Sequence, residues 1–443
     1  MLAPADAEVA RRDPAVPGIA LVLDPEALLA RLQQRNPAWG LVAAEARYVR
    51  YKPTTSCLVG YRLHQAGPAG AGGPAVEVSV KAYRQGDGAK AAKTAEAAET
   101  GPAGTTPPGP GGDWPVTSFA DELVVVAPVG VDRDLPALAR LVRPDQRRRL
   151  LQALLPEATD LHDAEPWCVR YKPERRWVGV VERHGVPAAL VKAFGAGELA
   201  RARAGLAFAG RTGLVVPALL GTSKRACALA GSWLPGQPLI DRLTGPEATT
   251  APLAEVGAAL ATLHATPPRR LVHEPPDVDA VATTAAAASV AALVPRLGPG
   301  VGAAAARLCR RLDALPGRTA ARHGDFSADQ VVLGRRGVGL IDFDNTAVGD
   351  PIADLGQFLA DLEAAEVDGR LAPGRARSLA ADLVTGYEEA GGVVPDGALA
   401  LHTAAALVRR AVEPFRHRRP DWPRRTEELL DRVAELAGEG ARQ

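Results

Sequence analysis

The stretch RHGDFSADQVVLGRRGVGLIDFDNTAVGDPIADLG, residues 322–356, contains two acidic loops separated by two short apolar runs. The tripeptide HGD at 323–325 precedes the first run, and Gln330 opens it. The turn LGRRGVG predicts an antiparallel hairpin that holds the two runs side by side as strands. Asp342 ends the second strand, so we expect Gln330 to lie beside Asp342, with Asp325 in the adjoining loop.

These residue types suit phosphoryl transfer from a nucleotide. The reaction needs a carboxylate to orient the acceptor hydroxyl and oxygen ligands to hold Mg²⁺ against the phosphates. Asp325 is the expected catalytic base, Asp342 the main metal ligand and Gln330 a second ligand. Asp344, two residues further along a strand, would share a face with Asp342 and support metal or substrate. HGD alone is a weak signal, since acidic turns are commonly solvated, but the full set of motifs is far more specific.

The set resembles the catalytic core of the aminoglycoside phosphotransferase and choline kinase superfamily, which has a protein-kinase-like fold. The resemblance implies ATP and Mg²⁺ as cofactors, Asp325 as the base and Asp342 as the metal-binding Asp. It also implies Asp354 as the helix Asp that braces the catalytic loop, with His323 in a supporting role. Gln330 replaces the usual Asn and keeps its carboxamide oxygen. Maltokinases of the same superfamily are similar at this position.

An internal repeat precedes this stretch, because VRYKP occurs at 49–53 and again at 169–173. Each copy leads into a strand-like run and then into a second strand that ends in Lys plus an aromatic residue, VSVKAY at 78–83 and ALVKAF at 189–194. The pattern predicts two related β-hairpin units. Only the second copy runs on into the catalytic stretch, so we expect the first to be a non-catalytic cap with a structural Lys81.

The resemblance also implies nucleotide-binding residues in and after the second copy. Lys192 matches the lysine that pairs with the α- and β-phosphates of ATP. Glu198 is the acid available nearby to pair with Lys192. The segment GSWLPGQPL, 231–239, resembles the hinge that binds adenine through backbone groups, and it includes Trp233 and Leu234.

Residues 66–75 and 101–115 are rich in Gly and Pro and predict loops, whereas 136–155 and 198–209 each predict a helix. The order of elements along the chain is β-rich, β-rich and then mostly helical from about residue 255, with one embedded hairpin. Such segregated elements indicate the α+β class. The resemblance implies a bilobal protein-kinase-like fold with an extra N-terminal β-rich cap. The expected parts are a cap (1–135), a nucleotide-binding subdomain (136–238) and a mainly helical C-terminal lobe with the acceptor site (239–443).

The segment RRAVEPFRHRRPDWP, 409–423, is the candidate acceptor site together with Asp325. Sugar sites combine an aromatic platform with directional hydrogen-bonding groups, and an amino sugar also needs a carboxylate near its ammonium group. The segment offers these groups in Glu413, Arg416, Asp421 and Trp422. An exposed basic helix end with a packing Trp is the simpler interpretation.

A similarity of this segment to glucosamine kinases of high-GC bacteria favours glucosamine as the acceptor and glucosamine 6-phosphate as the product. Aminoglycosides and maltose are alternative acceptors within the same class of enzyme. A catalytically silent nucleotide-binding module is the alternative from another class, although the nearly complete set of site residues argues against it.

Composition narrows the classes of partner. The chain has 443 residues, enough for two or three structural units at roughly 150 residues each. Its 52 basic and 51 acidic residues give a formal charge of +1, which provides no general reason to expect nucleic-acid or membrane binding. The four cysteines form no CxxC pair, so neither a zinc site nor a disulfide framework is indicated. The N-terminus has no apolar signal segment, and we expect a cytoplasmic enzyme.

Overall fold

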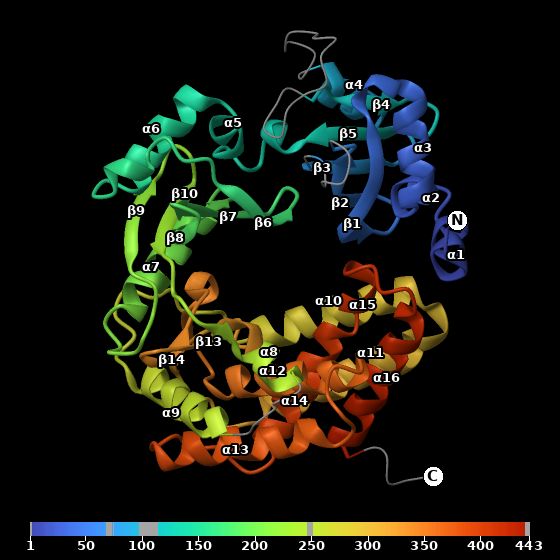
Figure 1. Ribbon diagram of the computed structural model, residues 1–443. Coiled ribbons are helices and arrows are strands. Elements are labelled where there is room, and N and C mark those ends of the chain that lie inside the picture. Colours follow the sequence, from blue (N-terminus) through green and yellow to red (C-terminus); the bar gives the residue numbers. More distant parts are fainter. Residues whose placement is uncertain (1, 68–72, 74, 97–113, 246–250, 439–443) are drawn as a thin grey trace. The chain divides into compact units, whose positions relative to one another are not determined.

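The computed structural model describes residues 2–67, 73, 75–96, 114–245 and 251–438 (Figure 1). The Gly- and Pro-rich stretches 66–75 and 101–115, predicted as loops, lie mostly outside these residues. The chain forms two compact units. The first comprises Met1–Ala196, Leu220–Ala230 and Phe415–Pro420, and the second comprises Gly197–Leu219, Gly231–Pro414 and Asp421–Gln443.

Two five-stranded sheets with the same strand order, β1-β2-β3-β5-β4 and β6-β7-β8-β10-β9, dominate the first unit (Figure 1). Strands of the first sheet are β1 Leu41–Lys52, β2 Ser56–Gln65, β3 Ala75–Tyr83, β4 Thr117–Phe119 and β5 Val124–Pro128. Strands of the second are β6 Trp167–Lys172, β7 Arg176–Arg183, β8 Val186–Phe194, β9 Leu219–Ser223 and β10 Ala228–Ser232.

The predicted repeat is confirmed in the strand register. Lys52 pairs with Ser56 at the first hairpin turn, and Lys172 pairs with Arg176 at the second. The two lysines of the repeat also correspond. Lys81 lies opposite Leu58 and Lys192 opposite Val178, at matching places in the two hairpins. We refer to residues 13–128 as the first repeat and to residues 132–232 as the second repeat.

An aspartate fixes the hairpin turn of each repeat in the same way. Asp13 Oδ2 accepts hydrogen bonds from the Tyr51 hydroxyl at 2.7 Å and from the backbone N–H of Thr54 at 2.8 Å. Asp132 Oδ2 accepts from the Tyr171 hydroxyl and from the N–H of Glu174, both at 2.8 Å. The turn residues Thr54 and Glu174 have positive φ of 58° and 61°.

The second repeat therefore includes Asp132, which the expected division into 1–135, 136–238 and 239–443 assigns to the cap. That division as a whole remains a prediction.

Short helices complete the first unit: α1 Pro4–Arg12, α2 Ile19–Leu23, α3 Pro25–Arg35, α4 Gly88–Glu96, α5 Leu138–Leu141 and α6 Pro144–Leu154. The single helix expected over 136–155 is wrong, because it breaks at Arg143 (φ −107°, ψ 116°). A residue before proline avoids the helical region, and Pro144 then starts the next helix. Single-turn 3₁₀ helices are η1 Pro37–Trp39, η2 Val129–Val131 and η3 Thr159–Leu161.

Six residues from the C-terminal part of the chain, 415–420, also belong to the first unit. Arg418 donates two hydrogen bonds to the carboxylate of Asp6, at 3.1 and 2.7 Å, and one to the carbonyl of Leu23 at 2.9 Å. The ring of Phe415 lies edge-on to Tyr51 in the first repeat. Residues 239–443 therefore do not form one continuous lobe.

The second unit is mainly helical, as predicted, and the α+β class is confirmed. Its helices are α7 Glu198–Ala209, α8 Leu239–Thr244, α9 Ala251–Ala265, α10 Val278–Leu293, α11 Gly298–Asp313, α12 Ile352–Val367, α13 Arg375–Glu389, α14 Ala398–Arg410, α15 Glu413–Arg416 and α16 Trp422–Leu436. Short strands form two small sheets from β11 Gln237–Pro238, β13 Val331–Gly334 and β14 Gly337–Leu340, and from β12 Ala320–Arg322 and β15 Ala347–Gly349. The 3₁₀ helices are η4 Pro295–Leu297, η5 Ala328–Gln330 and η6 Phe343–Asn345.

Small residues allow the helices of this unit to pack closely. A Cβ atom at Gly386 of α13 would lie 2.1 Å from the Ala254 carbonyl oxygen of α9. A Cβ atom at Gly356 of α12 would lie 2.6 Å from the His402 Cβ of α14. Helix α12 buries Leu355, Phe358 and several other residues, so it is a rigid support for what lies beside it.

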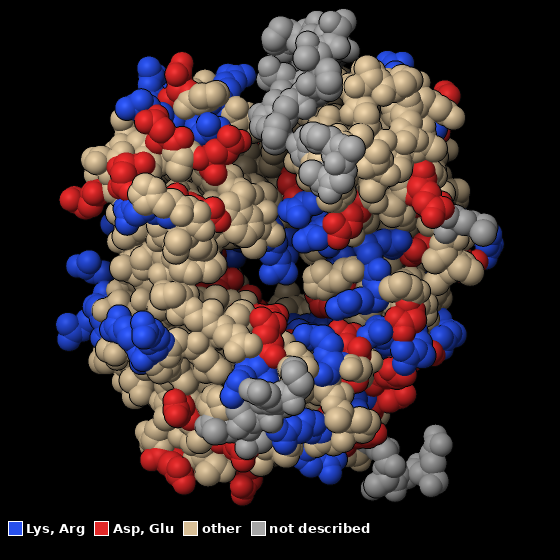
Figure 2. All heavy atoms as spheres, viewed as in Figure 1, with Lys and Arg blue, Asp and Glu red and all other residues tan. Residues whose placement is uncertain are grey.

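The face drawn in Figure 2 carries side chains of both charges. Basic and acidic side chains are interspersed on the face drawn in Figure 2, in keeping with the formal charge of +1. No helix within the described residues is both long enough and apolar enough to cross a bilayer.

Candidate active site

The hairpin predicted between the two acidic loops is present. Strands β13 and β14 are antiparallel, with Val331 opposite Leu340. The N–H of Ile341 donates to the carbonyl of Gln330 at 3.0 Å, so the pairing continues one residue beyond the strands. This contact places the backbone of Gln330 next to the residue that precedes Asp342. Gln330 itself lies in η5, and the strand begins one residue later than predicted.

The second acidic loop differs from the predicted strand. Strand β14 ends at Leu340, and Asp342 has a left-handed backbone with φ 66° and ψ 55°. This residue turns the chain into η6, where Asp344 is only 5% exposed. The prediction that Asp344 shares a strand face with Asp342 is therefore wrong. A non-glycine residue held at positive φ is typical of ligand-binding and catalytic loops.

Helix α12 holds the loop that carries HGD, residues 323–328, which we call the catalytic loop. Asp354, in the first turn of α12, is fully buried. Its carboxylate accepts hydrogen bonds from the backbone N–H groups of His323 at 2.5 Å and Gly324 at 2.9 Å. The contact predicted between the helix Asp and the loop is thus present.

Two further residues of α12, which the sequence did not single out, bind the same loop. The Nε2 group of Gln357 donates a hydrogen bond to Asp325 Oδ1 at 2.7 Å. Asp361 Oδ2 accepts from the N–H of Ala328 at 3.2 Å. With Asp354 they lie at helical spacings of three and four residues, which places all three on one face of the helix. The sequence could have indicated Gln357 and Asp361 as loop-binding residues, because their spacing from Asp354 places them on its face of the helix.

The charge on Asp354 is secured by a second set of contacts. His264 Nε2 lies 3.1 Å from Asp354 Oδ2, and His264 Nδ1 lies 2.9 Å from the Tyr387 hydroxyl. Burial raises the pKa of Asp354, but the hydrogen bond from His264 and the charges of His264, Arg322 and His323 outweigh it and lower the pKa to about 2. Asp354 is therefore an acceptor of hydrogen bonds at any neutral pH.

His323 links the two acidic loops. Its ring is fully buried between Phe326 and Phe343, with ring centroids 5.6 and 4.9 Å away. The ring Nε2 donates to the carbonyl of Ile341 at 2.9 Å, which fixes the tautomer, since a carbonyl only accepts. The next residue, Gly324, has φ 81°, and a Cβ there would lie 2.3 Å from a backbone oxygen of η6.

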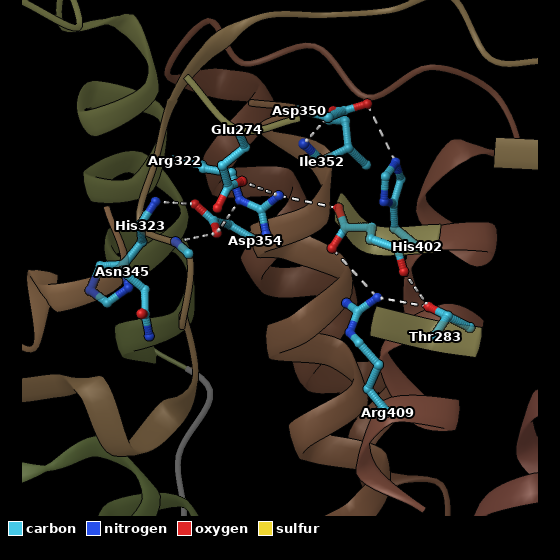
Figure 3. Close-up of polar contacts among 12 residues, drawn as sticks. Glu274, Thr283, Arg322, His323, Asn345, Asp350, Ile352, Asp354, His402 and Arg409 are labelled. Atoms are coloured by element: carbon cyan, nitrogen blue, oxygen red, sulfur yellow. Dashed lines mark hydrogen bonds and ion pairs between the residues drawn. The ribbon is translucent and has the colours of Figure 1, made fainter. Parts of the chain in front are cut away.

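A network of buried and half-buried polar side chains lies next to the strand that leads into the catalytic loop (Figure 3). Arg322, in β12, pairs with Glu274 at 3.0 Å and with Asp279 of α10 at 3.1 Å. Arg409 of α14 pairs with Asp279 at 3.5 Å and donates to the Thr283 hydroxyl at 3.2 Å. The network connects two helices to the strand that leads into the loop. This network was not predictable from local patterns, because its members come from four separate segments of the chain.

Helix α7 packs directly against the second acidic loop. A Cβ at Gly205 would lie 2.0 Å from the carbonyl oxygen of Phe343, so the helix and η6 touch backbone to backbone. Arg201 of the same helix donates to the carbonyl of Asn345 and pairs with Glu274 at 2.7 Å. The sequence predicted the helix with its correct bounds but not this contact.

The residues predicted to bind ATP lie in different parts of the chain. Lys192 is buried, at 8% exposure, in β8 of the first unit. Glu198 is exposed at the first position of α7 in the second unit, and within the described residues it forms no ion pair. Trp233 is 37% exposed, while Leu234 packs so closely on β14 that a Cβ at Gly339 would lie 2.6 Å from its side chain.

The predicted acceptor residues lie on α15 and at the start of α16. Trp422, the first residue of α16, is 2% exposed, so it offers no ring face to a sugar and is corrected to a core residue. Asp421 bonds Arg424 and Arg425, and these hydrogen bonds lower its pKa to about 2. Glu413 is half-buried in the second unit, whereas Arg416 belongs to the first.

The residues available for a metal ion fit Mg²⁺. Gln330 and Asp342 offer hard oxygen donors from two loops that the backbone contact of Gln330 brings together. Among the residues that the structure describes, no group of three or more His, Cys, Asp and Glu side chains is placed to hold a metal. Mg²⁺ in kinases takes only one or two protein carboxylates, because substrate phosphates and water supply the other ligands.

Comparison with known proteins places this site in a family. The family model described as "Phosphotransferase enzyme family" matches residues 161–393, which contain most of the second repeat and both acidic loops. No curated protein matches the chain in sequence.

Solved structures similar to the chain include three kinases. A choline/ethanolamine kinase family protein from Mesorhizobium loti is 17% identical, covering 66% of this chain and 94% of that one, with a TM-score of 0.48. A choline kinase from Cryptosporidium parvum is 13% identical over 66% and 96%, with a TM-score of 0.49. An aminoglycoside phosphotransferase from Streptomyces rimosus is 18% identical over 63% and 96%, with a TM-score of 0.40. Because the family model spans more than half of its residues, the chain belongs to the phosphotransferase enzyme family.

Proposed function

We propose that the protein is a kinase that transfers the γ-phosphoryl group of ATP, in the presence of Mg²⁺, to the 6-hydroxyl of glucosamine. The observation that carries the proposal is the attachment of the catalytic loop to α12, which holds the carboxylate of Asp325 in place. The chain also belongs to a family of phosphotransferases. Phosphoryl transfer depends mainly on positioning and charge stabilisation, and a loop fixed in this way supplies the positioning.

Asp325 is the proposed catalytic base. Its Oδ1 accepts the hydrogen bond from Gln357, so we assign the acceptor hydroxyl to Oδ2. There the carboxylate orients the hydroxyl oxygen towards the γ-phosphorus and accepts its proton as the new P–O bond forms. His323 and Asp354 hold the loop in place without contact with substrate.

Gln330 and Asp342 would hold Mg²⁺, with Asp344 as a further candidate. An ion held by these residues would supply positive charge that offsets the negative charge of the phosphates. Lys192 is the proposed partner of the α- and β-phosphates, and Glu198 is retained only as a candidate for pairing with that lysine.

The segment 231–239, with Trp233 and Leu234, is the proposed adenine-binding segment. Support comes from its position along the hairpin, because Gln237 pairs with Leu333 of β13. Adenine is recognised largely through backbone groups, and an extended segment beside a strand offers such groups.

Glucosamine is the proposed acceptor on narrower grounds. Its ammonium group needs a carboxylate, and Glu413 at the start of α15 is a half-buried carboxylate of the second unit. Arg416 remains a candidate for hydrogen bonding to hydroxyls, while Trp422 is excluded by its burial. Asp421 is less suited than Glu413, since its carboxylate already binds two arginines.

The experiment is an ADP-release assay with Mg-ATP on an acceptor panel of glucosamine, N-acetylglucosamine, glucose, maltose, choline and an aminoglycoside. We expect ADP release that depends on acceptor and is highest with glucosamine. Asp325→Ala should lower kcat about 10²- to 10⁴-fold, the range of general-base contributions. Asp329→Ala, an exposed aspartate of the same segment, is the matched control and should retain activity.

Other outcomes separate the alternatives. Faster turnover with maltose or an aminoglycoside would replace the acceptor and keep the mechanism. ATP binding without turnover on any acceptor would indicate a nucleotide-binding module. Undiminished turnover in Asp325→Ala would overturn the role of Asp325.

A further inference from the structure

The catalytic loop runs alongside α12 in register with one face of the helix. Asp354 binds the backbone at the start of the loop, Gln357 binds the side chain of Asp325, and Asp361 binds the backbone of Ala328 at the end. Asp354 and Asp361 accept hydrogen bonds from backbone N–H groups of the loop, whereas Gln357 donates one to a side chain. That side chain is the proposed catalytic base.

We propose that Gln357 is the positioning residue that sets the orientation of the Asp325 carboxylate. A carboxylate on a loop rotates readily about its last side-chain bond. The 2.7 Å hydrogen bond to Oδ1 fixes this rotation and directs Oδ2 to the acceptor. The inference rests on the proposed function, in which Asp325 contacts the acceptor hydroxyl.

The chemistry of the amide suits this task. A Lys or Arg at the same place would also hold the carboxylate, but its charge would weaken the carboxylate as a proton acceptor. The carboxamide N–H donates one directional hydrogen bond and adds no net charge. Gln357 thus orients the base without neutralising it.

Both partners are held by neighbours that are themselves fixed. Phe326, next to Asp325, and Phe358, next to Gln357, are fully buried, and their ring centroids are 5.2 Å apart. Gly356, on the other side of Gln357 in the sequence, packs closely on α14, because a Cβ there would lie 2.6 Å from the His402 Cβ. The aromatic pair therefore fixes the spacing between the loop and the helix beside the Gln357–Asp325 hydrogen bond.

The test is Gln357→Met, which keeps the length of the side chain and removes the donor. We expect kcat to fall roughly 10- to 100-fold, since small losses of alignment cost about this much. The KM for ATP and the melting temperature should stay unchanged. The matched control is Gln33→Met in α3, which removes a 2.8 Å hydrogen bond to the Leu41 carbonyl and should leave kcat unchanged.

A second variant, Gln357→Glu, preserves size and polarity and places a like charge beside Asp325. Its kcat should fall further than that of Gln357→Met while the protein remains folded. In the Asp325→Ala background, Gln357→Met should cause no additional loss, because a positioning residue acts through the group it positions.

The inference is overturned if Gln357→Met and Gln357→Glu retain wild-type kcat, or if either raises the KM for ATP with kcat unchanged. It is overturned equally if Gln357→Met lowers the residual rate of Asp325→Ala by the same factor as in the wild type. The proposed function fails by a different result, namely full turnover in Asp325→Ala. An inactive Asp325→Ala with fully active Gln357 variants would remove the positioning role alone.

Discussion

The first repeat and the second repeat build their hairpins with the same strand order, register and Asp–Tyr hydrogen bond, yet their matching lysines differ. Lys81, in the first repeat, forms an ion pair with Glu174 at 2.6 Å, and its side chain is 25% exposed. Lys192, in the second, is 8% exposed. Arg50 also pairs with Glu174, so one carboxylate of the second repeat binds two cations of the first.

The comparison distinguishes the residues that close the hairpin turn from the lysine position at which the two repeats differ. The shared residues are those that close the turn, such as Asp13 and Asp132, which are needed wherever this hairpin forms. The differences lie at the lysine, and the family model begins at residue 161, after the first repeat. The cap role of the first repeat remains a prediction, and Glu174 is a hydrogen-bond partner of Lys81.

The largest effect on kcat/KM should come from replacing each of the two lysines separately. Lys192→Met should lower kcat/KM for ATP about 100-fold, since a charge-assisted phosphate contact is lost at a desolvated site. Lys81→Met should change kcat/KM less than about threefold and act on stability instead. Steady-state kinetics of both variants measure the contrast. Equal losses in both would show that the two repeats share the function.

The next largest effect concerns the feature that the repeats share. Asp13→Ala and Asp132→Ala each leave a tyrosine hydroxyl and a turn N–H without their acceptor, which should cost about 2 kcal/mol of unfolding free energy. Urea unfolding measures both. Only Asp132→Ala should also lower activity at fixed temperature, since it loosens the repeat that carries Lys192. A loss of unfolding free energy in only one of the two variants would contradict an equivalent structural role for the two aspartates.

The smallest effect is expected at Glu174 and depends on pH. Burial raises the pKa of Glu174, but the hydrogen bonds and charges of Lys81 and Arg50 outweigh it and leave the pKa below its ordinary value. A carboxylate whose pKa is lower in the folded state stabilises the fold at pH values above its unfolded-state pKa of about 4.5. This stabilisation is lost as the pH falls through the folded-state pKa. Glu174→Gln should therefore cost about 1 kcal/mol at pH 7 and progressively less below pH 4.5. A stability difference that is constant from pH 7 to pH 3 would contradict the ion pair.

Much of the fold was predictable because its signals are local. Five identical residues marked each repeat, and the run ELARARAGLAFA predicted a helix with the bounds observed for α7. The break at Arg143 was also a local signal, in the proline that follows, but the helical pattern on both sides concealed it. The path of residues 415–420 into the first unit was not predictable, because it depends on the buried Asp6 more than 400 residues away.

The candidate site divides in the same way. The hairpin, Asp325 and the contact of Asp354 with the loop follow from spacing within one segment. The left-handed turn at Asp342 was not predicted, because an acidic residue after an apolar run is as typical of the last residue of a strand as of a turn. Trp422 was misassigned because sequence alone does not show whether an aromatic residue after a proline faces solvent or the core.

The most direct measurement of the central claim is labelling with an acyl-phosphate derivative of ATP in the presence of Mg²⁺. A lysine amine beside the bound phosphates attacks the acyl carbon, forms an amide and releases ATP, and mass spectrometry of peptides then locates the acyl group. We predict acylation at Lys192 that excess ATP suppresses, with no ATP-sensitive label at Lys81. ATP-sensitive labelling of Lys81, or its absence at Lys192, would contradict the assignment of nucleotide binding to the second repeat alone.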